Sequence, residues 1–198
     1  MASRTPRYER LTTFARDLTD LPDPGPDRGY RLERADEALL AEFHRTAPKG
    51  LNARKLAVLR DRLGTDEQVW VVRDADGAFL GWCHMIAGSG PNSRIGHTLR
   101  LRADEVFLFD DRTLAGFQRR GVHAFTIRRR MELAREAGAR RAVTTITNAN
   151  AASRASYGRL GFTPRSQLLH VPALHRTVEL PATPAWLREV ARGRRGRR

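Results

Sequence analysis

The chain has 198 residues, of which 40% are hydrophobic, and this suits one globular domain with a sizeable core. No apolar run approaches the roughly 20 residues of a membrane span, and residues 1–20 lack the apolar segment of a secretory signal. The formal net charge of +14 admits an acidic or nucleic-acid partner, whereas the single cysteine, Cys83, excludes an internal disulfide and favours a cytoplasmic location.

The first part of the chain, residues 1–28, is expected to be an N-terminal extension and linker. It holds an amphipathic stretch over 8–21, followed by residues 22–27, whose Pro, Asp and Gly are typical of a linker. The sequence leaves open whether this extension folds onto the domain, swaps to a partner or stays loose. Residues 29–183 are expected to form the main domain.

The first half of that domain is expected to hold two helices and a hairpin. A strand over 30–34 precedes a helix over 36–45, and Asn52 is a candidate cap for a second helix with Leu56, Leu59 and Leu63 inward. The β-rich segments 68–73 and 78–87 flank an Asp-Ala-Asp-Gly turn, which predicts a hairpin. The remaining expected elements here are a loop over 88–92 and an irregular strand over 98–102.

The second half alternates strands and helices. A strong strand signal over 105–110 is followed by a helix over 122–136, which Gly138 ends. The expected elements after it are a buried strand over 141–147, a helix over 150–160, and strands over 167–171 and 176–180. This alternation predicts the α/β (α+β) class, with helices packed on a mixed sheet.

The last part, residues 184–198, is expected to be a short helix over 184–192 and an Arg-rich, disordered tail. The basic residues there are compatible with nucleic-acid binding. That partner is not favoured, because few aromatic residues alternate with the arginines to stack on bases.

A turn between a strand and a helix carries the first chemical signal. It reads Gln118-Arg119-Arg120-Gly121-Val122-His123-Ala124 and opens the helix over 122–136. The first N–H groups of a helix have no partner within it and face the positive end of its dipole. Because Gly121 lets a ligand approach the main chain, this turn is a candidate phosphate site.

The second signal follows the strand over 141–147. Asn150, Ser153 and Tyr157 are spaced by three and four residues, which places them on one face of a helix. Gly161-Phe162 then turns the chain into the next strand.

Together the two signals resemble the GNAT superfamily of acyl-CoA N-acyltransferases. The family's phosphate loop, Q/R-x-x-G-x-G/A, matches Gln118 to Gly121, and its Asn, small residue, Tyr and Gly-Phe signature matches Asn150 to Phe162. The sequence departs from the pattern at His123, where the family has Gly or Ala. The resemblance implies a mostly antiparallel central sheet flanked by helices, and an acyltransferase domain over 29–183.

The resemblance also implies a cofactor site for acetyl-CoA or another acyl-CoA. The strand before the loop would pair with the pantetheine arm near Thr113, Leu114 and Ala115, and the loop would hold the pyrophosphate. The residues expected to bind the cofactor are Thr113, Leu114, Ala115, Gln118, Arg119, Arg120, Gly121, Val122, His123, Ala124, Asn150, Ser153 and Tyr157.

The resemblance further implies that Tyr157 is a general acid for the departing CoA thiolate, since a phenol with a pKa of about 10 can donate a proton. The candidates for the base that deprotonates the amine are Glu105, Asp110 and Asp111, with His84 and His97 as alternatives. Cys83 lies on the opposite strand face from His84, and nothing suggests a covalent acyl-cysteine step. The histidines show no metal-ligand spacing, so no metal site is expected.

The expected activity is transfer of an acyl group, by default acetyl, to a primary amine on a small molecule or peptide. The acceptor would bind between the helices over 36–63, the hairpin over 68–87 and the loop over 88–104. The alternative is a non-catalytic module that binds acyl-CoA or serves a nucleic-acid complex. A homodimer is compatible with the sequence, which does not determine the oligomeric state.

Overall fold

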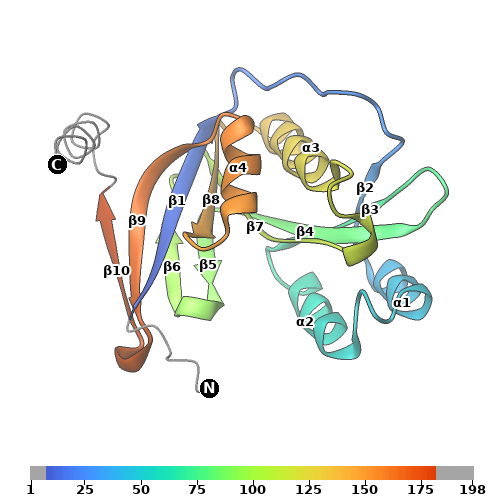
Figure 1. The fold of residues 1–198 in the computed structure, drawn as a ribbon, viewed down its shortest axis with the longest axis horizontal. Coiled ribbons are helices and arrows are strands. Elements are labelled where there is room, and N and C mark those ends of the chain that lie inside the picture. Colours follow the sequence, from blue (N-terminus) through green and yellow to red (C-terminus); the bar gives the residue numbers. More distant parts are fainter. Residues whose placement is uncertain (1–7, 182–198) are drawn as a thin grey trace, which may run out of the picture.

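The computed structural model describes residues 8–181 (Figure 1). Its main feature is an eight-stranded sheet in the order β10-β9-β1-β8-β7-β4-β3-β2, in which only β7 and β8 are parallel. The strands are Glu9–Asp17 (β1), Arg31–Arg34 (β2), Gln68–Arg73 (β3), Phe79–Ala87 (β4), Glu105–Thr113 (β7), Arg141–Thr147 (β8), Thr163–Val171 (β9) and Arg176–Pro181 (β10). A mostly antiparallel sheet flanked by helices confirms the predicted fold class.

Helices cover both faces of this sheet. Two helices pack on one face beside β3 and β4, and two on the other face beside β7 and β8 (Figure 1). They are Glu37–Thr46 (α1), Ala53–Leu63 (α2), Val122–Glu136 (α3) and Ala151–Arg159 (α4). The first core unites Leu40, Phe43 and Leu59 with Trp82, and the second unites Ile127 and Met131 with Leu108.

Local sequence signals set the ends of the helices. The Asp36 side chain accepts a hydrogen bond from the Leu39 N–H at 2.7 Å, and the Asn52 side chain accepts one from Lys55 N–H at 2.9 Å. These two N-caps satisfy donors that the first helical turn leaves unpaired. The expected cap at Asn52, the hairpin at β3 and β4, and the helices in the second half are confirmed.

Part of the N-terminal segment, whose placement the sequence left open, folds onto the domain. Strand β1 lies within the sheet, antiparallel to β8 on one side and β9 on the other. Leu11 and Phe14 are both buried, although they face opposite sides of the sheet. Residues 9–17 are therefore part of the core, and the linker that follows crosses above α3 to reach β2 (Figure 1).

One difference from the expected elements lies after β4. Residues expected as a loop form Ser89–Asn92 (β5), which pairs with His97–Arg100 (β6) as a separate two-stranded sheet. Ile95 and Leu99 from this hairpin pack on Phe107 and Leu168, covering the sheet face opposite α3 and α4. The helix expected over 184–192 lies outside the described residues. Within 8–181, no helix is long and apolar enough to cross a membrane.

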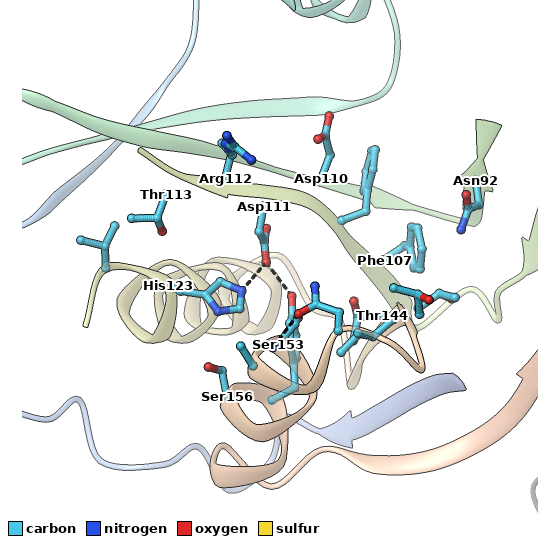
Figure 2. A pocket seen from close by; sticks show the side chains of 18 of the residues that line it. Asn92, Phe107, Asp110, Asp111, Arg112, Thr113, His123, Thr144, Ser153 and Ser156 are labelled. Carbon is cyan, nitrogen blue, oxygen red and sulfur yellow. Dashed lines mark hydrogen bonds and ion pairs between the residues drawn. The ribbon is translucent and has the colours of Figure 1, made fainter. Parts of the chain in front are cut away.

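Strands β7 and β8 separate soon after they meet. They pair only from Glu105 opposite Arg141 to Phe107 opposite Val143, although both strands continue further. Beside this separation β7 carries a bulge, where its register against β4 shifts and Asp110 adopts a left-handed φ of 49°. Asp110 and Asp111 point to opposite sides of the strand, as successive side chains do (Figure 2). The bulge places Asp110 on the same side as Phe109, and so sets which side each carboxylate faces.

Candidate active site

An open cleft of about 1580 Å³ follows the separation of β7 and β8. On one side it is lined by α2 and the β5–β6 hairpin, and on the other by the N-terminal ends of α3 and α4. Backbone groups on β7 after Phe107 and on β8 after Val143 have no partner across the gap, because the ladder ends there. The cleft thus offers main-chain donors and acceptors along its floor.

The loop before α3 forms one end of the cleft. Gly121 is the N-cap of α3 at φ 83°, no side chain caps the helix, and Arg119 is also left-handed at φ 61°. The N–H groups of Val122, His123 and Ala124 are therefore free of helical partners where they line the cleft. A Cβ added at Gly121 would lie 3.4 Å from Nε of Arg28, so a cation from the linker also lies beside this loop.

Helix α4 lines the cleft on the same side as this loop. Asn150 caps it by accepting a hydrogen bond from the Ser153 N–H at 3.1 Å, and both residues line the cleft. One face of the helix carries Tyr157, which is 2% exposed and packs edge-on against Phe162 with ring centroids 4.9 Å apart. The spacing of Asn150, Ser153 and Tyr157 therefore places the helix cap, a residue that lines the cleft and a buried phenol along one face of α4.

A buried ionic network lies beneath the cleft. Tyr157 donates its hydroxyl hydrogen to Oδ2 of Asp111 at 2.8 Å, and Nε2 of His123 lies 3.2 Å from the same oxygen (Figure 2). The other carboxylate oxygen, Oδ1, lies 2.6 Å from Nη2 of Arg130, whose side chain is fully buried. Arg130 also donates to the backbone oxygen of His84 at 2.6 Å.

This network sets the protonation states of its members. Burial alone would raise the pKa of Asp111, but the Arg130 cation and the His123 hydrogen bond outweigh it and hold the pKa below its ordinary value. Burial, and then the Asp111 charge, raise the pKa of Tyr157 above its ordinary range. At neutral pH the network thus holds a carboxylate that accepts from a protonated phenol.

Asp110 points to the other side of β7, toward α2. Its Oδ2 lies 2.5 Å from Nζ of Lys55 and 2.5 Å from Nη1 of Arg62, and Arg62 also contacts Glu67 at 3.0 Å. Burial raises the pKa of Asp110, and these cations more than offset it, so the pKa lies below its ordinary value. Asp110 is therefore an ionised carboxylate between two cations on the cleft wall.

His84 lies beside this group without a hydrogen bond. Its side chain is fully buried, Nδ1 is 3.7 Å from Oδ2 of Asp110, and neither ring nitrogen has a hydrogen-bond partner among the described residues. Burial lowers the pKa of His84 to about 3, so the ring is neutral at physiological pH. The lowered pKa of Asp110 accordingly rests on Lys55 and Arg62.

Other sequence candidates lie away from the cleft. Glu105 sits where β7 and β8 are still paired, is 1% exposed, and accepts a hydrogen bond from Arg165 at 2.8 Å. His97 lies on β6, with Nε2 3.9 Å from Glu179. Burial raises the pKa of the Cys83 thiol to about 12, which keeps it protonated. None of these three residues lines the cleft.

Most of the expected cofactor residues do line the cleft. They are Thr113, Gln118, Arg119, Gly121, Val122, His123, Ala124, Asn150, Ser153 and Tyr157. Leu114, Ala115 and Arg120 do not: the Leu114 N–H donates to Leu80 O at 2.8 Å, and the Arg120 guanidinium lies over the Phe117 ring. A backbone donor already used within the sheet is not available to a ligand.

Four charged residues at the site had no sequence signal. Arg28, Lys55, Arg62 and Arg130 come from the linker, α2 and the middle of α3, outside both motifs. In the sequence they look the same as solvent-exposed charges. In the fold, Arg28 lies beside the loop before α3 and Arg130 contacts Asp111. Lys55 and Arg62 contact Asp110. Among the described residues no cluster of three His, Cys, Asp or Glu side chains is arranged to hold a metal ion.

Comparison with known families agrees with this geometry. A model described as the acetyltransferase (GNAT) family matches residues 33–162. This segment holds both motifs, strands β3, β4, β7 and β8, and every residue that lines the cleft except Leu11, and it is well over half of the chain. The chain belongs to the GNAT family of acetyltransferases. No curated protein matches it significantly.

Solved structures share the fold at low identity. A GCN5-related N-acetyltransferase from Sphaerobacter thermophilus has a TM-score of 0.59 at 12% identity, over 90% of this chain and 54% of that one. A GCN5-related N-acetyltransferase from Kribbella flavida has a TM-score of 0.54 at 16% identity, over 91% of this chain and 60% of that one.

The spermidine N-acetyltransferase of Vibrio cholerae, solved with CoA and spermine, has a TM-score of 0.51 at 15% identity, over 69% of this chain and 82% of that one. This chain spans between 51% and 62% of the length of four of the structures that it matches.

Proposed function

We propose that this protein is an N-acyltransferase that moves an acyl group, by default acetyl, from acyl-CoA to a primary amine. The observation that carries the proposal is the cleft between β7 and β8, with an uncapped helix N-terminus at one end and Tyr157 beside it. Family membership supports the same class of reaction.

The residues at the cleft fit a CoA-like donor. Gly121 leaves open the space that a Cβ would fill, and the three free N–H groups after it face a position suited to a pyrophosphate. Arg119 and Arg28 supply positive charge at the same end. Free backbone groups on β7 and β8 suit an amide-bearing arm, because such an arm pairs with a strand edge as another strand does.

The proposed reaction uses side chains on both sides of β7. The donor supplies a thioester whose carbonyl an amine can attack. We assign Tyr157 to protonate the departing sulfur and Asp110 to bind the acceptor as an ammonium, in competition with Nζ of Lys55. The low pKa of Asp110 suits ammonium binding. The bound ammonium gives one proton to water before the neutral amine attacks, and the nitrogen gives a second proton to Asp110 or water as the C–N bond forms.

Glu105 has a different part in this proposal. It is an ion-pair partner of Arg165 and Arg141 at the paired end of β7, where it stabilises the start of the separation. The acceptor enters from the α2 and β5–β6 side, where Lys55, Arg62, Asn92 and Arg94 line the cleft. These groups suit an acceptor that carries a carboxylate or other polar group besides its amine.

Isothermal titration with acetyl-CoA tests the donor site. Gln118→Glu combined with Gly121→Asp places two negative charges against the expected phosphates and should abolish saturable binding. The matched control, Gln167→Glu with Gly138→Asp, makes the same two changes away from the cleft and should bind as the wild type does. No binding of acetyl-CoA or longer acyl-CoAs by the wild type would reject the proposal.

A panel of amines tests the acceptor side by release of free CoA. The non-catalytic alternative predicts saturable binding of acyl-CoA without release for any amine. Asp110→Asn should reduce kcat/KM for the amine by about 10²-fold. The affinity for acetyl-CoA should stay unchanged, because Asp110 faces the acceptor side of β7.

A further inference from the structure

The loop before α3 has a histidine at the position where the family pattern has Gly or Ala. That residue, His123, begins α3 and points away from the loop toward β7 (Figure 2). Its Nε2 reaches Oδ2 of Asp111 at 3.2 Å, and its ring packs edge-on against Tyr157 with centroids 5.7 Å apart. The departure therefore brings an imidazole to the residue that receives the hydrogen bond of Tyr157.

The hydrogen bond of Tyr157 creates a difficulty for its proposed role. The hydroxyl hydrogen is donated to the Asp111 carboxylate at 2.8 Å. If Tyr157 gave a proton to sulfur with nothing in return, a phenolate would face a carboxylate at that distance. Two like charges so close in a buried site repel strongly, and the same carboxylate raises the pKa of Tyr157.

We infer that His123 and Asp111 act through Tyr157 by returning the proton that Tyr157 gives to the departing sulfur. Protonated His123 passes its Nε2 proton to Oδ2 of Asp111, and Asp111 passes that proton to the Tyr157 oxygen as the phenol hydrogen moves to sulfur. The thiol leaves, Asp111 and Tyr157 regain their starting states, and His123 ends neutral. The inference rests on the proposed acyl transfer.

Exposure and charge both fit this direction of proton movement. The side chain of His123 is 28% exposed, against 12% for Asp111 and 0% for Arg130. Among these residues His123 is therefore the one that can exchange a proton with solvent. The groups facing His123 are Asp111 on β7 and Tyr157 on α4, with Arg130 on its own helix bound to the far oxygen of Asp111. Cys83 on β4 stays protonated and does not compete.

His123→Gln separates a proton-carrying role from a structural one. Glutamine can still donate a hydrogen bond to Asp111, but it cannot gain or lose a proton. His97→Gln on β6 is the matched control, since His97 does not line the cleft. The measurements are acetyl-CoA affinity, the single-turnover rate of acyl transfer against pH, and rescue of His123→Ala by added imidazole.

The expected result for His123→Gln is unchanged acetyl-CoA affinity with a transfer rate about 10²-fold lower. The dependence of the transfer rate on pH should differ between the wild type and the variant, because glutamine cannot carry a proton. Added imidazole should restore part of the rate of His123→Ala.

Two outcomes would overturn the inference. The first is a His123→Gln rate and pH profile equal to those of the wild type and of His97→Gln. The second is loss of acetyl-CoA binding by His123→Gln, which would make His123 a phosphate-loop residue only. If the wild type binds no CoA, the proposed function itself fails.

Discussion

Removing the buried cation of Arg130 should destabilise the fold in a way that depends on pH. Arg130 is fully buried, lies 2.6 Å from Asp111, and donates to the backbone oxygens of His84 at 2.6 Å and Thr126 at 3.1 Å. Arg130→Met keeps much of the volume but leaves Asp111 as a buried carboxylate without its cation. Breaking a buried pair on one side costs about 3–5 kcal/mol, so we expect about 4 kcal/mol at pH 7.

The pH dependence follows from the protonation of Asp111. In the wild type its folded pKa is depressed, so the pair stabilises the fold above the unfolded pKa of about 3.9 and this contribution is lost as pH falls. Without Arg130, burial raises the folded pKa, and a protonated Asp111 no longer needs a cation. The destabilisation should therefore shrink by about 1–3 kcal/mol between pH 7 and pH 4.5.

Urea unfolding followed by tryptophan fluorescence measures both quantities. Arg129→Met is the control, because Arg129 is 39% exposed on the same helix and pairs with Glu132; it should cost less than about 1 kcal/mol. Adding Asp111→Asn to Arg130→Met should recover about 2 kcal/mol. A cost for Arg130→Met below about 1 kcal/mol, or one that is the same at both pH values, would refute the reasoning.

Three further predictions concern His84, Gly121 and Arg28. His84 has a folded pKa of about 3, so protonation of the unfolded state below its ordinary pKa destabilises the fold as pH falls. His84→Leu removes this effect, and between pH 6.5 and 4.5 the wild type should lose about 2 kcal/mol more than the variant in urea titrations; parallel curves would contradict this. Gly121→Ala places a Cβ at φ 83°, which should cost about 1–2 kcal/mol and weaken acetyl-CoA binding in calorimetry, whereas Gly158→Ala in α4 should not weaken binding; equal affinities would contradict it. Arg28→Ala should weaken acetyl-CoA binding by about twofold to fivefold with a reduced salt dependence, while Arg31→Ala on β2 serves as the control; no change would remove Arg28 from the donor site.

Hydrophobic periodicity and end signals in the sequence were enough for most helices and strands. Asn52, Gly121 and Gly138 mark helix ends through local backbone and side-chain chemistry, which needs no distant partner. The two motifs at 118–124 and 150–162 likewise depend on spacing within one turn or helix. Local geometry helps to explain why Gln118, Asn150, Ser153 and Tyr157 lie on the same cleft.

Strand β1 shows where the local sequence left the structure open. Leu11 and Phe14 are three residues apart, a spacing that does not alternate as a one-sided strand does. Both faces of β1 are buried, however, and its polar residues find partners across the sheet: Thr12 with Asn148 at 2.8 Å and Thr13 with Thr145 at 3.3 Å. Pairings more than a hundred residues apart leave no trace in the local pattern.

The sequence by itself indicated the class of the fold, the loop that we propose binds the donor, and Tyr157 as a candidate acid. Each depends on residues close together in the chain. Only the tertiary structure decided which side of the sheet Asp110 and Asp111 each face, because the bulge in β7, where the register against β4 shifts, interrupts the alternation before Asp110. It also decided the charge around them, since Lys55, Arg62 and Arg130 reach the site from separate helices, and electrostatic interaction depends on distance in space.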